Sequence, residues 1–250
     1  MKHLIYILAL LICAFSIAQN NILFSQGNSL YNEGKFQDAI NTYESILDTE
    51  NHSSELYFNL ANAYYKLNRI APSVYYYEKA LQLSPNDKDI KNNMSFAKNM
   101  TIDAIELIPE MGFSKITKNI INRFSFDVWA ILSVVFVALF VVLFLTYYFS
   151  YSTNRKRLTF LSSILSLFLV LITLMFAFQK YEYEQNDNPA IVFALESEIK
   201  SEPNLRSEIA FKLHEGTKVQ VLEIYNENWT KIKLSDGKTG WISSQDIKEL

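Results

Sequence analysis

Side chains that could act as nucleophiles, general bases or metal ligands are scarce in this chain of 250 residues. The single cysteine, Cys13, lies inside an apolar run near the N-terminus, and the three histidines are His3, His52 and His214. Removal of that run would leave no thiol, which excludes disulfides, thiol catalysis and cysteine-based metal sites from the rest of the chain. With so few groups for nucleophilic or zinc chemistry, we predict no catalytic, metal-binding or cofactor-binding residues.

Carboxylates and phosphate-binding loops offer no better candidate. Glu196 and Glu198 lie in a polar stretch, where a solvated surface is the simpler interpretation. The sequence contains no glycine-rich phosphate loop. The net charge of −3, without a strongly basic domain, argues against nucleic acid as a partner. Binding through polar and aromatic side chains is therefore the expected function, and the elements that position those side chains come next.

An internal repeat is the clearest pattern in the N-terminal half of the chain. A shift of 34 residues superposes seven pairs, which are Gly27 on Ala61, Asn28 on Asn62, Leu30 on Tyr64, Tyr31 on Tyr65, Ala39 on Ser73, Tyr43 on Tyr77 and Ile46 on Ala80. This is the period of a helix–turn–helix unit. Small residues allow its two helices to cross closely, and aromatic residues fill the space between hairpins. Gly34 suits the turn, and Pro85 ends the second unit.

The second copy, residues 57–85, closely resembles a tetratricopeptide repeat. The first copy is less typical, because Gln26 and Asn51 stand where that family favours leucine and proline. We therefore predict an all-α tetratricopeptide-repeat solenoid at residues 19–102. Two repeats are followed by a capping helix at residues 88–101, which covers the open end of the solenoid.

The resemblance implies a groove that holds an extended peptide or a helix of a partner protein. The residues that the first helices offer to this groove are Phe24, Asn28, Tyr31, Asn59, Asn62, Tyr65 and Lys66. Asn28 and Asn59 resemble the asparagines of chaperone-tail clamps, but Phe24 replaces the lysine of such a clamp. The asparagines could instead cap or brace the helices, and the sequence leaves both roles open.

Residues 1–18 predict a secretory signal peptide. Lys2 and His3 precede an apolar run, and Ser16-Ile17-Ala18 supplies small residues before a cleavage point. An uncleaved anchor is one alternative. A lipoprotein carrying its lipid on Cys13 is another, which the bulky residue before that cysteine disfavours. With a signal peptide or an anchor, the segment that follows is exported.

Two uncharged runs predict transmembrane helices at residues 128–149 and 158–178, since each is long enough to cross a hydrocarbon core of about 30 Å. The connection at residues 150–157 ends in Arg155-Lys156-Arg157 and is predicted to be a cytoplasmic loop. Basic residues also flank the pair, so the exported N-terminal part decides the orientation. We predict a protein of the bacterial cytoplasmic (inner) membrane with both soluble domains in the periplasm.

The linker at residues 103–127 is amphipathic. Its apolar face holds Ile116, Ile120, Ile121 and Phe124, and its polar face holds Lys115, Lys118, Asn119, Asn122 and Arg123. Such a segment can lie in the headgroup plane, where basic side chains contact anionic membrane lipid. An ordinary packed linker helix is the alternative. A polar, acidic spacer at residues 179–189 follows the second span.

Residues 190–250 change to short β-branched runs separated by turn residues, a pattern typical of a small antiparallel sheet or barrel. They resemble bacterial SH3-like domains at Trp229 and at residues 203–206, 213–219, 233–234, 236–237 and 240–242. The predicted surface consists of Tyr225, Trp229 and Trp241, although core packing is the favoured role of both tryptophans. The resemblance implies peptidoglycan peptides or partner proteins as targets.

The order of signal peptide, repeats, two-helix transmembrane hairpin and all-β barrel resembles the BatE-like tetratricopeptide-repeat membrane proteins of Bacteroides aerotolerance (Bat) operons. That resemblance implies membrane partners with von Willebrand A domains, a MoxR-type ATPase system, and a role in stress tolerance or envelope maturation. We predict a membrane-anchored extracytoplasmic scaffold without enzymatic activity. A peptidoglycan-binding envelope protein is the alternative. A transporter is poorly supported, because neither span holds an ionisable residue.

Overall fold

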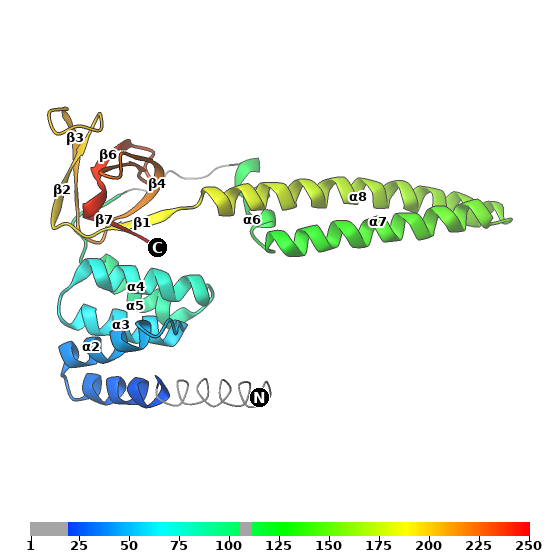
Figure 1. The fold of residues 1–250 in the computed structure, drawn as a ribbon. Helices are drawn as coiled ribbons and strands as arrows, with labels where there is room; N and C mark the ends of the chain where they lie inside the picture. The colour runs from blue at the N-terminus through cyan, green and yellow to red at the C-terminus, as the bar shows by residue number, and fades with distance from the viewer. Residues whose placement is uncertain (1–19, 106–111) are drawn as a thin grey trace, which may run out of the picture. The chain divides into compact units, whose positions relative to one another are not determined.

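The computed structural model describes residues 20–105 and 112–250, with the backbone alone at residues 113 and 114. The predicted signal peptide lies outside the described residues. The chain divides into two compact units (Figure 1). One unit joins the N-terminal part, up to Leu107, with the C-terminal part, from Asn188, and the other is Ile108–Asp187.

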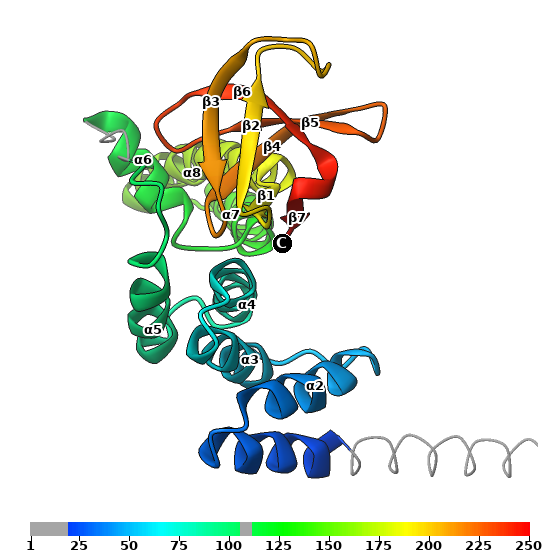
Figure 2. The ribbon, with the colours of Figure 1, turned by 90° about the vertical axis from the view of Figure 1, so that its left-hand side faces the viewer.

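Stacked helices form the N-terminal part of the first unit (Figure 2). A helix at residues 20–32, which carries no label, forms an antiparallel hairpin with α2 (Phe36–Leu47). The second hairpin consists of α3 (Ser54–Lys66) and α4 (Ile70–Leu83), and α5 (Lys88–Lys98) packs against both of its helices. These are the two predicted repeats and the helix that follows them, although α5 ends three residues before the predicted position 101.

The ends of these helices follow from local sequence. Ser53 caps α3 by accepting a hydrogen bond from the Leu56 backbone N–H at 3.1 Å. Asp87 caps α5 in the same way, accepting from the N–H of Ile90 at 3.1 Å. Gly34 takes a φ of +78° in the turn before α2, a left-handed conformation that favours glycine.

The repeated tyrosines form the centre of each hairpin. Tyr43 and Tyr77, one period apart, are each only 1% exposed. A Cβ atom at Gly27 would lie 2.4 Å from Cε1 of Tyr43, so the first hairpin can close only around a residue without a side chain. The equivalent Ala61 carries a Cβ and is fully buried. The two hairpins therefore share a plan but differ in how closely the helices approach.

The C-terminal part is a seven-stranded antiparallel sheet with the strand order β3-β2-β6-β5-β4-β1-β7. The strands are β1 (Pro189–Val192), β2 (Glu196–Lys200), β3 (Ile209–His214), β4 (Lys218–Tyr225), β5 (Trp229–Lys233), β6 (Thr239–Ser243) and β7 (Ile247–Glu249). Its apolar centre includes Ile199, Ile232 and Ile242, all fully buried. Gly240 allows β6 to approach β2, since a Cβ there would lie 2.4 Å from Cγ2 of Ile199. The predicted β-rich module is thus present.

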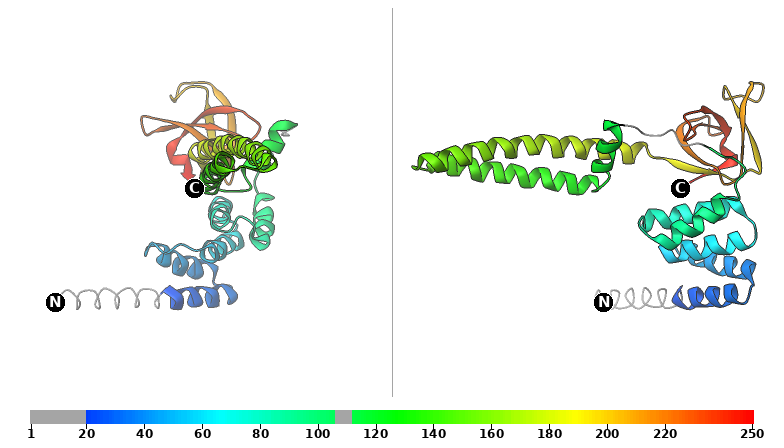
Figure 3. Two further views of the ribbon diagram at one scale, coloured as in Figure 1. Left: turned by 90° about the vertical axis from the view of Figure 1, so that its right-hand side faces the viewer. Right: turned by 180° about the vertical axis from the view of Figure 1, so that it is seen from behind.

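The second unit holds α6 (Phe113–Ile121) and a hairpin of two long helices, α7 (Phe126–Phe149) and α8 (Thr153–Asn186), which run antiparallel (Figure 3). Serines 133, 163 and 166 are buried between the two long helices, and Ser166 donates a hydrogen bond to the Phe136 carbonyl at 2.8 Å. Large apolar side chains point outward. The hairpin therefore packs through small residues and exposes its apolar side chains.

Two boundaries differ from the sequence prediction. Most of the predicted loop at 150–157 is helical, because α8 begins at Thr153 and includes the three basic residues. Most of the predicted spacer at 179–189 is the end of α8, which runs to Asn186. An ion pair one turn apart, Lys180 to Glu184 at 3.4 Å, stabilises that polar extension.

The close approach at Gly27 predicts the effect of a larger side chain there. Gly27→Val should lower the free energy of unfolding by about 1–3 kcal/mol, because Tyr43 has no space into which to move. In the full chain in detergent, thermal unfolding followed by helical circular dichroism should show a midpoint lower by about 2–10 °C. The exposed neighbour provides a control, since Gln26→Val should change the midpoint little. Equal midpoints for the two variants would contradict the packing argument.

Candidate functional site

A repeated group of asparagines and tyrosines lies on the first helices of the solenoid. In the first repeat, the Tyr43 hydroxyl donates to Oδ1 of Asn28 at 2.7 Å, and Nδ2 of Asn59 donates to the same oxygen at 2.9 Å. Burial raises the pKa of Tyr43 to about 12, so its hydroxyl remains a donor at neutral pH. This asparagine pair joins the first helix of one repeat to the first helix of the next.

The same arrangement recurs one period later. The Tyr77 hydroxyl donates to Oδ1 of Asn62 at 2.5 Å, and Nδ2 of Asn93 donates to that oxygen at 3.1 Å. Asn93 belongs to α5 and stands 34 residues after Asn59. The asparagine ladder, defined as these two pairs, therefore extends from the first helix of the first repeat through α3 to α5.

A hollow lies beside the second pair. Its volume is about 140 Å³, and its lining residues are Tyr31, Asn62, Tyr65, Lys66, Tyr77, Asn93 and Phe96. Four of the residues predicted for the groove are among them. Phe96 is 57% exposed, although phenylalanine is a residue that normally seeks burial. The hollow therefore combines carboxamides, a lysine and exposed aromatic rings, a set of groups suited to a peptide.

The other predicted groove residues occupy different surroundings. Asn28 and Asn59 bond to each other within the ladder. Phe24 packs against Tyr43, with ring centroids 6.0 Å apart, and lines a separate hollow of about 290 Å³ near His52. Sequence reasoning missed Asn93 and Phe96, because α5 was interpreted as a cap. Continuing the 34-residue shift from Asn59 would have found the first of them.

The sheet docks on α4 within the same unit, and a buried carboxylate marks the junction. Glu78 is 7% exposed and accepts from two lysines, Lys98 Nζ on Oε1 at 3.0 Å and Lys218 Nζ on Oε2 at 2.8 Å. Burial alone would raise the pKa of Glu78, but the two lysines lower it below its ordinary value. One lysine comes from α5 and the other from β4. This carboxylate therefore joins the third helical layer and the sheet to the second hairpin.

The Glu78 contact repeats an earlier one. Glu44 accepts a hydrogen bond from the Tyr64 hydroxyl at 2.5 Å, and a shift of one period places Glu78 against Lys98. By its contacts, α5 is thus the first helix of a third repeat. The sheet then covers the face of α4 where the second helix of that repeat would pack.

A second carboxylate fixes the chain where it leaves α5. Asp103 accepts hydrogen bonds from the His214 backbone N–H at 2.7 Å, from His214 Nδ1 at 2.8 Å and from Thr217 Oγ1 at 2.7 Å. Partial burial would raise the pKa of Asp103, but these hydrogen bonds lower it. His214 is thus engaged in the junction, and His52 Nδ1 lies 2.8 Å from the Tyr57 hydroxyl. Within residues 20–105 and 112–250, no group of three His, Cys, Asp or Glu side chains could hold a metal ion.

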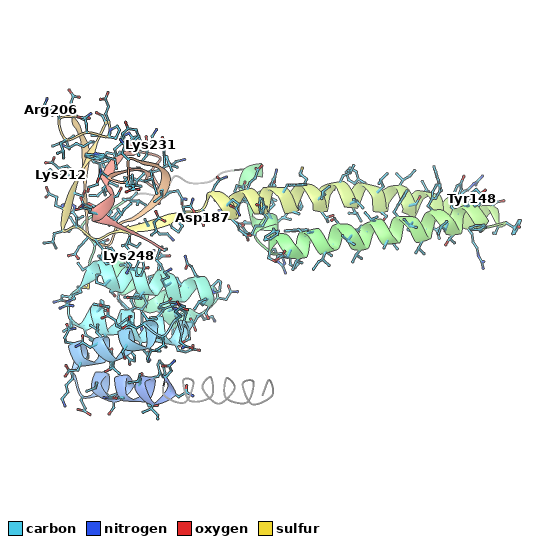
Figure 4. The ribbon with its side chains drawn as sticks, in the orientation of Figure 1. Tyr148, Asp187, Arg206, Lys212, Lys231 and Lys248 are labelled. Carbon is cyan, nitrogen blue, oxygen red and sulfur yellow. The ribbon has the colours of Figure 1, made fainter. Side chains whose placement is uncertain are left out.

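Apolar contacts complete the junction. Tyr75 of α4 meets Phe193 edge-on, with centroids 5.7 Å apart, and Lys248 Nζ lies 4.6 Å from the Tyr75 ring centroid. Figure 4 shows Lys248 on the side of the sheet nearest α4. A Cβ at Gly216 would lie 2.9 Å from Cγ2 of Ile70, so the turn before β4 approaches α4 closely. Hydrogen bonds, ion pairs and apolar packing thus all cross this junction.

The predicted SH3-like surface residues differ in exposure. Tyr225 is 46% exposed, Trp229 is half-buried, and Trp241 is only 9% exposed. Tyr225 and Trp241 meet edge-on with centroids 6.1 Å apart, and Lys231 Nζ lies 5.6 Å from the Trp241 ring centroid. Leu222 and Ile224 of β4 are also exposed, at 49% and 57%. The free aromatic and apolar groups of this surface therefore lie along the end of β4.

Comparison with protein families identifies both modules. Residues 54–87 match the tetratricopeptide repeat, and residues 198–248 match the bacterial SH3 domain. The chain therefore carries a tetratricopeptide repeat and a C-terminal bacterial SH3 domain. No curated protein matches the chain. The match to the repeat covers α3 and α4, and the contacts described above relate the flanking helices to the same plan.

The ion pairs of Glu78 make the stability of the first unit depend on pH. The folded-state pKa of Glu78 lies below the value of about 4.3 expected in the unfolded chain, so its contribution is present above that pH and is lost as the pH falls through the folded pKa. Glu78→Gln should lower the free energy of unfolding at neutral pH by about 1–3 kcal/mol, since two lysines lose their partner. It should also weaken the loss of stability between about pH 5 and pH 3.

The measurement is thermal unfolding of the full chain in detergent across that pH range. Glu33 offers a matched control, because its ion pair with Lys35 at 2.8 Å is half-exposed. Glu33→Gln should change stability by less than about 1 kcal/mol. A Glu78→Gln variant whose unfolding midpoint falls with pH in parallel with the original chain would show that this carboxylate does not join the layers.

Proposed function

We propose that this protein is a membrane-anchored scaffold that binds a protein partner in the groove of its tetratricopeptide repeats. The observation that supports it most is the composition of the first unit, which is assembled from chain segments on both sides of the helical hairpin. Because the repeats and the SH3 domain pack together, both ends of the hairpin must leave a membrane on the same side. A hairpin that crosses twice meets this requirement.

The chemistry of the hairpin supports membrane insertion. The most apolar windows of α7 and α8 have mean hydropathies of 3.1 and 2.5, and only 11% and 17% of those windows is buried. The core helix of a soluble protein would be mostly buried, whereas here Val134 is 67% exposed and Leu161 is 65% exposed. Water would penalise such a surface, and acyl chains would not.

Aromatic residues mark both ends of the spans. Trp129 and Tyr181 lie near the open end of the hairpin, and Tyr147 and Tyr151 lie near its turn. Helical rise places Trp129 about 27 Å from Tyr147 along α7. That separation suits the thickness of a hydrocarbon core, whose edges attract tryptophan and tyrosine.

The proposed orientation places the basic turn inside the cell and both soluble modules in the periplasm. Arg155, Lys156 and Arg157 follow the turn at the beginning of α8, where the positive-inside tendency favours the cytoplasm. The basic residues at the open end weaken an argument from charge counting alone. The exported N-terminal segment supplies the remaining support, because it precedes the repeats and sends them outward.

The groove favours a peptide segment of a protein as its ligand. Carboxamide groups bind main-chain N–H and C=O groups together, and aromatic rings such as Phe96 contact side chains. The likeness to BatE-like proteins suggests membrane proteins with von Willebrand A domains as partners, served by a MoxR-type ATPase. Attachment to one membrane raises the local concentration of groove and partner without any additional contact. We propose no catalytic step, since the two histidines in the described chain serve structural contacts.

A peptidoglycan-binding role for the SH3 domain is the second candidate. It is favoured by exposed Ile224 and Tyr225, which together form an apolar and aromatic strip at the end of β4. Binding of the full chain to purified wall sacculi tests it. Loss of binding in Tyr225→Ala would support this role, and no binding by the original chain would exclude it.

The groove proposal predicts where a partner can be captured. A photoreactive benzophenone amino acid in place of Phe96, which is exposed beside the hollow, should form adducts with one or a few proteins in native membranes. The same group in place of Leu83, which is 52% exposed at the end of α4, serves as the control and should form few adducts. Adducts with lipids alone, or equal adducts from both positions, would contradict the proposal.

The membrane arrangement predicts a pattern of labelling. In a chain whose Cys13 is replaced by serine, single cysteines are introduced as Ser95→Cys, Tyr151→Cys and Leu205→Cys, all at exposed positions. A membrane-impermeant maleimide applied to spheroplasts should label positions 95 and 205. Position 151, in the turn of the hairpin, should react only after lysis. Labelling of position 151 in intact spheroplasts, or protection of either of the others, would overturn the orientation.

A further inference from the structure

The helix α6 is fixed to the open end of the hairpin. Trp129 of α7 donates from Nε1 to the Ile121 carbonyl at 3.0 Å, which occupies a backbone acceptor at the end of α6. Its ring meets Phe124 edge-on, with centroids 5.2 Å apart, and meets Phe176 of α8 at 5.1 Å. Lys180 Nζ donates to Asn122 Oδ1 at 3.2 Å. Both long helices therefore hold the end of α6 in place.

The direction of α6 differs from that of the hairpin. Figures 1 and 2 show α6 running across the long axis of α7 and α8 rather than continuing it. If the hairpin crosses a bilayer, a helix held across its open end lies along the bilayer surface. This orientation is that of an interfacial helix.

The two faces of α6 have different surroundings. Ile121 is fully buried against the hairpin, while Ile116 and Ile120, on the same side of the helix, are 58% and 44% exposed. Phe124, just beyond the helix, is 42% exposed. These side chains continue the apolar surface of the hairpin, so one environment can cover both.

The opposite face is basic. Lys115 and Arg123 are exposed, and Lys118 lies between them on the same side. The nearby acidic groups are Asp127 at the beginning of α7, and Glu182 and Glu184 of α8, of which Glu184 is paired with Lys180 at 3.4 Å. The segment from α6 to the beginning of α7 therefore has three basic residues and one acidic residue.

We propose that α6 lies in the headgroup layer of the leaflet at the open end of the hairpin and binds anionic phospholipid there. Ile116, Ile120 and Phe124 contact the acyl chains, and Lys115, Lys118 and Arg123 contact lipid phosphates. The surface rests on the proposed membrane insertion of the hairpin, with which its apolar face is continuous. Its effect is to fix the level at which the chain leaves the bilayer on its way from the repeats.

Spin-label depth measurements in nanodiscs test the position of α6. In the full chain with Cys13→Ser, labels are attached at Ile116→Cys, Ile120→Cys, Asn119→Cys and, within the hairpin, Val142→Cys. Labels at 116 and 120 should relax faster with oxygen than with a polar nickel complex, and the label at 119 should show the reverse. The label at 142, on a side chain that is 59% exposed, reports whether the hairpin itself is in the lipid.

The outcomes separate the two proposals. If position 142 lies in lipid while 116 and 120 are as accessible to nickel as 119, the interfacial position is wrong and the scaffold proposal stands. If position 142 is in water, membrane insertion fails, and the lipid surface fails with it.

Lipid preference provides the second test. The ratio of phosphatidylglycerol to phosphatidylcholine retained by the purified full chain should fall in Lys115→Gln/Lys118→Gln/Arg123→Gln, by up to about fivefold for each basic residue that contacts a headgroup. Lys88→Gln/Lys91→Gln/Lys238→Gln removes the same charge from exposed positions of the first unit and should leave the ratio unchanged. Equal ratios in the two triple variants would overturn the binding of anionic lipid.

Discussion

The buried carboxylate of Glu78 is the contact on which the first unit depends. A carboxylate that is 7% exposed has lost most of its hydration, and only charged partners can compensate for that loss. Each of its oxygens has its own lysine, one from α5 and one from β4. Loss of either layer would leave the charge half-compensated. Docking of the third helical layer and docking of the SH3 domain are therefore energetically coupled, and the solenoid and the sheet act as one body.

This coupling extends across a large separation in sequence. Glu78 and Lys218 are 140 residues apart, and closing so long a loop in a flexible chain is entropically unfavourable. The hairpin reduces that cost, because α7 and α8 run antiparallel and return the chain close to where it left. Asp103 adds a second fixed point immediately before the second unit, through its three hydrogen bonds to residues 214 and 217. The insertion of a membrane hairpin between two packed modules is thus compatible with a stable junction.

The sequence predicts well those parts of the fold that repeat or that have an extreme composition. The 34-residue shift located both hairpins, the uncharged runs located α7 and α8, and the glycines of the C-terminal turns indicated an antiparallel sheet. The junction could not be predicted, because Glu78, Asp103 and Lys218 resemble ordinary solvated charges until the surfaces that bury them are known. The contact of α5 was obscured for a related reason, since Tyr64 in one repeat is replaced by Lys98 in the next. The interaction with glutamate persists, while the residue type changes.

The same limit applies to the groove, where bracing and binding seemed to be alternatives. A carboxamide has an acceptor and a donor end. The ladder uses Oδ1 of Asn28 and Asn62 together with Nδ2 of Asn59 and Asn93, and among the described residues no hydrogen bond occupies Nδ2 of Asn62 or Oδ1 of Asn93. Bracing by the buried tyrosines therefore holds the carboxamides in one orientation and leaves a donor and an acceptor beside the hollow. A peptide that binds there meets groups that are already ordered, which lowers the entropic cost of recognition.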